Sequence, residues 1–88
     1  MVLLDLLGRR WALRVLWELR GTQLTFRELQ QACGQISPTV LNERLRELRK
    51  GKLVDLDDER GYCLSSQGED LIDKFLPVVR WADRWARS

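Results

Sequence analysis

The chain has no histidine and only two cysteines, Cys33 and Cys63, among its 88 residues. Histidine is the commonest general base and metal ligand, so we expect no enzyme, no cofactor and no bound metal. Two cysteines are too few for the disulfide framework of a small secreted domain, and we expect both thiols to be free. No apolar run approaches the length of a membrane span, and segment 1–7 is too short and too acidic for a secretory signal, so we expect a cytoplasmic protein.

Charged residues nearly balance over the whole chain, whose net charge is only +2, but they are unevenly placed. Residues 1–52 carry ten basic and five acidic side chains, whereas residues 53–88 carry five basic and eight acidic ones. This asymmetry predicts that the first part of the chain faces a polyanion. The length suits one small domain with a thin core, so we expect residues 1–88 to form a single domain.

Segment 37–51 carries the clearest pattern in the sequence and predicts one helix. Ser37 can accept hydrogen bonds from the first free backbone N–H groups, and Pro38 suits the first turn, where its missing N–H is not needed. Gly51 suits the left-handed residue that commonly follows a helix. Three leucines recur with the spacing of one helical face and are expected to be buried: Leu41, Leu45 and Leu48.

The opposite face of this predicted helix is polar. It carries Thr39, Glu43, Arg46 and Lys50, flanked by Asn42 and Arg49. A short helix that is held by leucines on one side and presents such side chains on the other has the form of a DNA recognition helix. The alternative is an ordinary surface helix with a solvated charged face.

The rest of the chain predicts further helices and one hairpin. The helices cover 2–7, Trp11 to Arg20, a stretch capped by Thr25 that runs to about Cys33, and a stretch from Ser65 to about Ala86. Pro77 should bend the last helix or divide it in two. We expect short strands over 22–24, 53–56 and 62–64, the last two joined by a turn over 57–61. This order predicts a mostly α fold with a small β-hairpin, the winged helix-turn-helix.

Five short motifs, in the same order, resemble those of the HxlR-type winged-helix transcriptional regulators, which are relatives of the MarR group. They are Gly8-Arg9-Arg10-Trp11, Leu24-Thr25-Phe26-Arg27-Glu28-Leu29, Ile36-Ser37-Pro38 followed by Arg44-Leu45-Arg46-Glu47-Leu48, Tyr62-Cys63-Leu64-Ser65 with Gly68, and Trp81. The resemblance covers about residues 4–85. It implies a dimeric winged helix that binds DNA and regulates transcription.

The chain departs from the family pattern at three places. Members often carry a Cys-Pro element ahead of the first tryptophan, and no cysteine precedes Trp11 here. The family places glycine immediately before Leu53, whereas this chain has Lys52 there and Gly51 one residue earlier. The wing is short and acidic, so we expect weak wing contacts; a single Arg60 stands among Asp55, Asp57, Asp58 and Glu59.

Ten residues are predicted to contact double-stranded DNA. The candidates for base edges are Thr39, Asn42, Glu43 and Arg46, because amide, guanidinium and carboxylate groups match adenine, guanine and cytosine. The candidates for phosphate contacts are Ser37, Arg27, Arg49, Lys50 and Lys52. Arg60 is the wing residue suited to a minor groove. Arg44 lies at the edge of the leucine stripe, where an ion pair and a phosphate contact are both open.

The last helix is apolar over more than one face, which predicts a homodimer. One small domain can cover one such face, and a second copy is the simplest cover for the other. The predicted interface consists of Leu3, Leu6, Phe75, Leu76, Val79, Trp81 and Trp85. The alternative is that the opening helix covers this surface within one chain. A two-fold dimer would bind a pseudo-palindromic operator.

Two other functions fit the same scaffold. The acidic wing and the small net charge favour a winged-helix module that binds protein and not DNA. A thiol-responsive regulator would use Cys33 or Cys63. The polar face of segment 37–51 favours a sequence-specific DNA-binding regulator.

Overall fold

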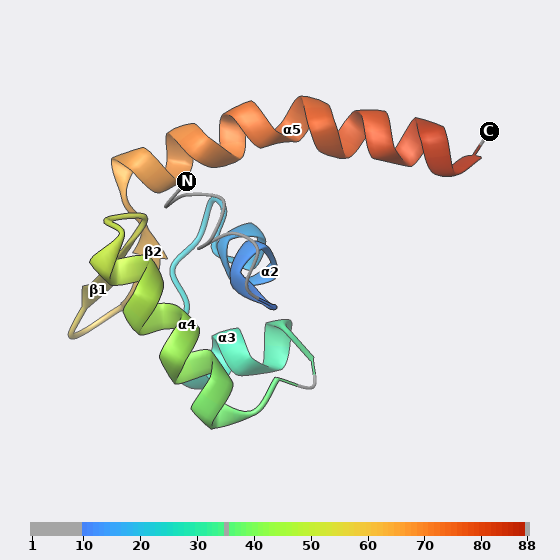
Figure 1. Cartoon of the computed structure of the whole chain (residues 1–88). Helices are drawn as coiled ribbons and strands as arrows, with labels where there is room; N and C mark the ends of the chain where they lie inside the picture. Colours follow the sequence, from blue (N-terminus) through green and yellow to red (C-terminus); the bar gives the residue numbers. More distant parts are fainter. Residues whose placement is uncertain (1–9, 35, 88) are drawn as a thin grey trace.

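The structure, a computed structural model, describes residues 10–34 and 36–87 (Figure 1). These residues form α2 (Ala12–Glu18), α3 (Phe26–Ala32), α4 (Pro38–Lys50), β1 (Val54–Asp57), β2 (Gly61–Leu64) and α5 (Ser66–Arg87). The predicted order of these elements is confirmed. The opening helix expected over 2–7, with Leu3 and Leu6 of the predicted dimer interface, lies outside the described residues.

Both helices of the helix-turn-helix begin at the caps that the sequence predicts. The Thr25 hydroxyl accepts a hydrogen bond from the Glu28 backbone N–H at 3.2 Å, and the Glu28 carboxylate accepts one from the Thr25 N–H at 2.9 Å. The Ser37 hydroxyl accepts a hydrogen bond from the Val40 N–H at 3.1 Å, and Pro38 is the first residue of α4. Each cap satisfies donors that a helix end otherwise leaves unpaired.

The wing is an antiparallel hairpin in which Asp57 pairs with Gly61, so residues 58–60 form its loop. The short strand expected before α3 is reduced to one residue, Leu24, which exchanges two backbone hydrogen bonds with Tyr62. This contact requires glycine at position 61. Gly61 has φ 98°, and a Cβ there would lie 2.4 Å from the Leu24 carbonyl oxygen.

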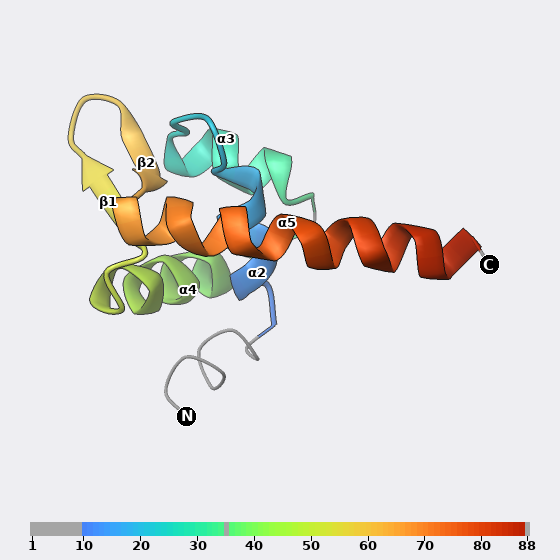
Figure 2. The ribbon, with the colours of Figure 1, turned by 90° about the horizontal axis from the view of Figure 1, so that it is seen from above.

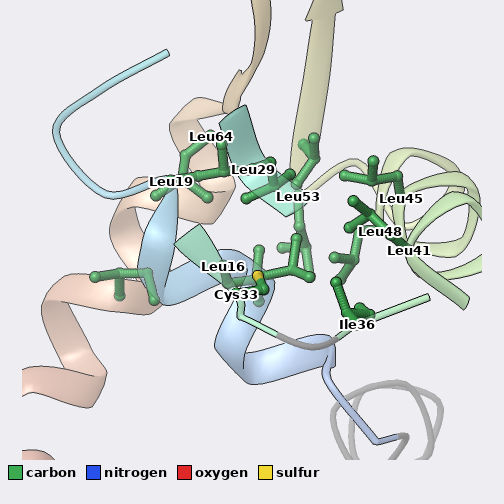
Figure 3. Close-up of a cluster of buried hydrophobic side chains, with 13 residues drawn as sticks. Leu16, Leu19, Leu29, Cys33, Ile36, Leu41, Leu45, Leu48, Leu53 and Leu64 are labelled. Atoms are coloured by element: carbon green, nitrogen blue, oxygen red, sulfur yellow. The ribbon is translucent and has the colours of Figure 1, made fainter. Parts of the chain in front are cut away.

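The hydrophobic core lies where α2 meets α3, α4 and the hairpin (Figure 3). Leu41, Leu45 and Leu48 of α4 are at most 1% exposed, which confirms the predicted stripe. They pack in one cluster with side chains of the other elements, among them Leu16 of α2 and Leu29 of α3. Their burial fixes the rotation of α4 about its axis and turns its polar face away from the core.

The last helix, α5, is one helix through Pro77, and its ribbon arches along its length (Figure 1). Of the two outcomes predicted for Pro77, a bend or a division, the division does not occur. Its buried residues, Gly68 and Ile72, lie near its start, and its C-terminal part extends beyond the body (Figures 1 and 2). The helices α3 and α5 lie on opposite sides of α2 (Figure 1). No helix within the described ranges combines the length and apolarity needed to cross a membrane.

The exit of α4 differs from the prediction, because the left-handed residue is Lys52 (φ 62°) and not Gly51 (φ −78°). The Lys52 N–H bonds the Arg49 carbonyl and the Leu53 N–H bonds the Leu48 carbonyl, both at 3.0 Å. These bonds form a Schellman motif, in which the residues on either side of the exit make a hydrophobic contact. Leu48 and Leu53 both belong to the buried core, and the bond between their backbones places the left-handed residue at 52.

Replacing Lys52 by glycine should raise the free energy of unfolding by about 0.5–1 kcal/mol, because glycine adopts a positive φ without the strain that a Cβ causes. Urea denaturation followed by circular dichroism measures the change. Lys52→Ala is the matched control, since it removes the same charge and keeps the Cβ. A glycine variant no more stable than the alanine variant would contradict this explanation.

Candidate nucleic-acid interface

The outer face of α4 is open to solvent. Thr39, Asn42, Arg46, Arg49 and Lys50 are exposed, and Glu43 is half-buried. Among the described residues, none of the three cations on this face forms an ion pair. The helix therefore presents unneutralised positive charge together with unused hydrogen-bonding groups. Such groups are the ones that contact phosphates and base edges in a major groove.

Two more predicted residues lie at the starts of the two helices, both of them exposed. Arg27 is in the first turn of α3. Ser37 uses its hydroxyl oxygen to cap α4, which leaves its proton available to donate to a phosphate. The turn between the helices is held by the Gln30 side-chain amide, which donates to the Ile36 carbonyl at 3.3 Å. This bond fixes the entry into α4.

A shallow hollow of about 570 Å³ lies between α4 and the wing. It is lined by Arg46, Arg49, Lys50, Val54, Asp55 and Leu56. Three cations against one acid give this hollow the charge expected of a surface that receives a phosphate backbone. Leu56, which is 37% exposed, was not predicted as a site residue, because the sequence does not show how far the hairpin extends past the core.

Asp57, one of the acidic residues of the wing, stabilises the loop of the hairpin. Asp57 Oδ1 accepts hydrogen bonds from the backbone N–H groups of Glu59 at 2.8 Å and Arg60 at 3.2 Å. These two bonds, with a smaller contribution from the Arg60 charge, lower the pKa of Asp57 below that of an ordinary aspartate. Asp57 therefore shapes the loop that carries the exposed Arg60.

Arg44 forms an ion pair and a backbone hydrogen bond inside the protein. Of the two roles that the sequence left open for it, an ion pair or a phosphate contact, the structure therefore shows the ion pair. Its side chain is 13% exposed and donates to the Glu47 carboxylate at 2.6 Å and to the Arg10 carbonyl at 3.0 Å. The Glu43 carboxylate lies 3.9 Å from the same guanidinium. Arg44 therefore ties α4 to the residues before α2 and partly neutralises Glu43, a predicted base contact.

The two cysteines are free, as expected. Cys33, at the end of α3, is 3% exposed, and Cys63 on β2 is half-buried. Burial raises the pKa of the Cys33 thiol, the nearby Glu18 raises it further, and Arg14 opposes them. Because the thiolate is the reactive form, this environment argues against Cys33 as a redox-sensing residue.

Removing the Arg44 side chain should lower the free energy of unfolding by about 1–2 kcal/mol, because it breaks the bond to Arg10 and leaves Glu47 without this partner. Arg46→Ala, on the exposed face of the same helix, is the matched control and should change it by less than about 0.5 kcal/mol. Urea denaturation of both variants measures the difference. Equal losses would show that Arg44 has no special structural role.

Comparisons with known proteins agree with this geometry. The HxlR-like helix-turn-helix family profile matches residues 6–88. The HTH-type transcriptional regulator YvaP of Bacillus subtilis is 29% identical over 87 residues, which cover 92% of this chain and 81% of YvaP. Quinone-bound YodB of B. subtilis has a TM-score of 0.83 at 31% identity, covering 92% of this chain and 90% of that one. A MarR-family regulator structure from Enterococcus faecalis has a TM-score of 0.84 at 29% identity, covering 96% and 82%.

The described elements, a helix-turn-helix followed by a hairpin and a long helix, are those of a winged helix, and the matched solved structures share this fold. The family profile spans nearly the whole chain. This chain belongs to the HxlR family of winged helix-turn-helix, DNA-binding transcriptional regulators.

Proposed function

We propose that the chain recognises a specific operator by inserting α4 into the major groove. The observation that carries this proposal is the division of α4 into a buried leucine face and an exposed face whose cations are unpaired among the described residues. Thr39, Asn42 and Arg46 read base edges, and Glu43 adds an acceptor if it releases Arg44. The protein acts in the cytoplasm, where its operator lies.

Phosphate contacts flank these base contacts in our proposal. Ser37 and Arg27 bind the backbone near the start of α4, where the helix dipole also favours an anion. Arg49, Lys50 and Lys52 bind it near the end of α4, beside the hollow at the wing. Arg60 enters the neighbouring minor groove from the loop that Asp57 shapes.

We propose that the regulator is a homodimer that joins through α5. The support is an apolar surface without cover in the described residues, where Val78, Trp81 and Trp85 are 51%, 57% and 67% exposed. The rings of Trp81 and Trp85 stack with centroids 6.1 Å apart. An apolar hollow of about 230 Å³ continues this surface between α2 and α5, lined by Leu13, Arg14, Trp17, Ile72, Phe75 and Val79. Leu76, half-buried on α5, completes the described part of the interface.

A two-fold axis through this interface would present two α4 helices to successive major grooves, about 34 Å apart or a multiple of that. Because α3 and α5 lie on opposite sides of α2, the second copy would leave the helix-turn-helix uncovered (Figure 1). The operator is then a pseudo-palindrome.

Arg46→Ala should cost about 1–3 kcal/mol in binding to an operator selected from a random duplex pool, and less on random DNA, because a base contact acts only on its own sequence. Fluorescence anisotropy at two salt concentrations measures both affinities. Lys50→Ala is the matched control; it should weaken binding equally on both duplexes and lower the salt slope by about one. If the parent binds no duplex at low salt, the proposal fails and a protein-binding module becomes the better explanation.

The double substitution of Trp81 and Trp85 by serine should convert the dimer to a monomer and weaken operator binding by about 100-fold or more, because one half-site must then suffice. The variant should keep its helical content, since both side chains are exposed. Arg80→Ala, about 100° round the helix from Trp81, is the control. Sedimentation velocity gives the oligomeric state, and a parent that sediments as a monomer would contradict the dimer.

A further inference from the structure

One small side chain, Ser65, links the exit of α4 to the start of α5. Its hydroxyl donates a hydrogen bond to the Lys52 carbonyl at 2.6 Å and accepts one from the Gly68 N–H at 3.0 Å. Its backbone N–H donates to the Leu53 carbonyl at 3.0 Å. Ser65 therefore caps α5 and at the same time holds Lys52 and Leu53, which follow the C-cap of α4 at Gly51.

The same segments approach each other closely at Gly68. A Cβ at this position would lie 2.1 Å from the Leu53 carbonyl oxygen, so the first turn of α5 rests on the backbone between α4 and β1. Lys52 keeps its left-handed φ of 62° here, a conformation that persists only where surrounding bonds fix it. We call Lys52, Leu53, Ser65 and Gly68 the α4–α5 joint.

Outside this joint, α4 and α5 are connected mainly through other elements. The recognition helix α4 packs on α2 and β1, whereas α5 packs on α2 and β2. In Figure 1, α5 begins beside the C-terminal end of α4 and then runs away from it across α2. A small rotation at the joint would therefore move the far end of one helix a long way relative to the other.

We propose that Ser65 is a positioning residue for operator recognition: in the homodimer proposed above, its hydrogen bonds fix the angle between α5 and α4. The two α4 helices then have one separation and one relative twist. Each base pair added between half-sites moves a half-site by about 3.4 Å and turns it by about 34°. A rigid joint cannot follow this displacement, whereas a loosened joint absorbs part of it.

The test uses the full chain and an operator that the parent protein selects from a random duplex pool. The affinity is measured for this duplex, for the same duplex with two base pairs inserted between the half-sites, and for one isolated half-site. Ser65→Asp is the discriminating variant, because aspartate can accept the Gly68 N–H and cap α5 but has no proton to donate to the Lys52 carbonyl. Ser65→Ala, which removes both bonds, is a second variant in case the aspartate chain does not fold.

Two control variants leave the joint intact. Ser65→Thr keeps a hydroxyl that donates and accepts, and Ser66→Ala changes an exposed neighbour. The parent and both controls should bind the two-base-pair insertion about 30-fold more weakly than the selected operator, since DNA or protein must deform to realign the half-sites. The affinity of Ser65→Asp and Ser65→Ala should fall by less than about 5-fold on the two-base-pair insertion. Their affinity for the isolated half-site should equal that of the parent.

The outcomes separate this role of Ser65 from the proposed function. If a folded Ser65→Asp or Ser65→Ala chain loses as much affinity as the parent when two base pairs are inserted, the positioning role is overturned. Operator binding would then still stand. A loss of half-site affinity in these variants would show a damaged α4 and would overturn it as well. A parent that selects no DNA, or that binds single half-sites as a monomer, would overturn the proposed homodimer and the positioning role with it.

Discussion

Burial of three leucines holds one side of α4 against the core and leaves the opposite side facing solvent. Leu41, Leu45 and Leu48 are at most 1% exposed, and burying a leucine side chain contributes about 1.5–3 kcal/mol. Rotation of α4 about its axis would expose this apolar surface. The helix therefore has one stable orientation. Apart from Glu43, which lies near Arg44, the side chains on its polar face form no ion pair within the described residues. In our proposal base recognition therefore uses exposed side chains of α4 that do little for stability, whereas Ser37 both caps the helix and contacts a phosphate.

The fold keeps its two surfaces apart. The helix α2 supplies the centre of the core, with α3 on one side and the long α5 on the other (Figure 1). In our proposal DNA binds at α4 and the second copy binds at α5, so neither partner hinders the other. In our proposal the α4–α5 joint then sets the position of the DNA-binding surface relative to the dimer surface. A strained Lys52 at this joint fits a site where geometry takes precedence over stability.

Local chemistry explains which features the sequence could predict. The caps at Thr25 and Ser37, the leucine spacing and the hairpin depend on residues close together in the chain, and all were predicted correctly. The left-handed exit of α4 depends on Leu53 packing, and the role of Arg44 depends on the carbonyl of Arg10, 34 residues away. Such contacts exist only once the chain has folded. Within the candidate site, the exposure of the polar α4 face followed from the helical periodicity of the leucines. The place of Leu56 in the hollow and the role of Asp57 in the wing turn could not be predicted in this way.

In our proposal α4 meets DNA with the side opposite its leucines. Intermolecular nuclear Overhauser effects between the labelled protein and its selected duplex report which side of α4 lies against the bases. We predict contacts from base protons to the Thr39 methyl group and the Asn42 side-chain amide, and none to the methyl groups of Leu41, Leu45 and Leu48. Contacts confined to the wing or to α5, or a complex in which the leucine methyl groups touch the duplex, would contradict the claim.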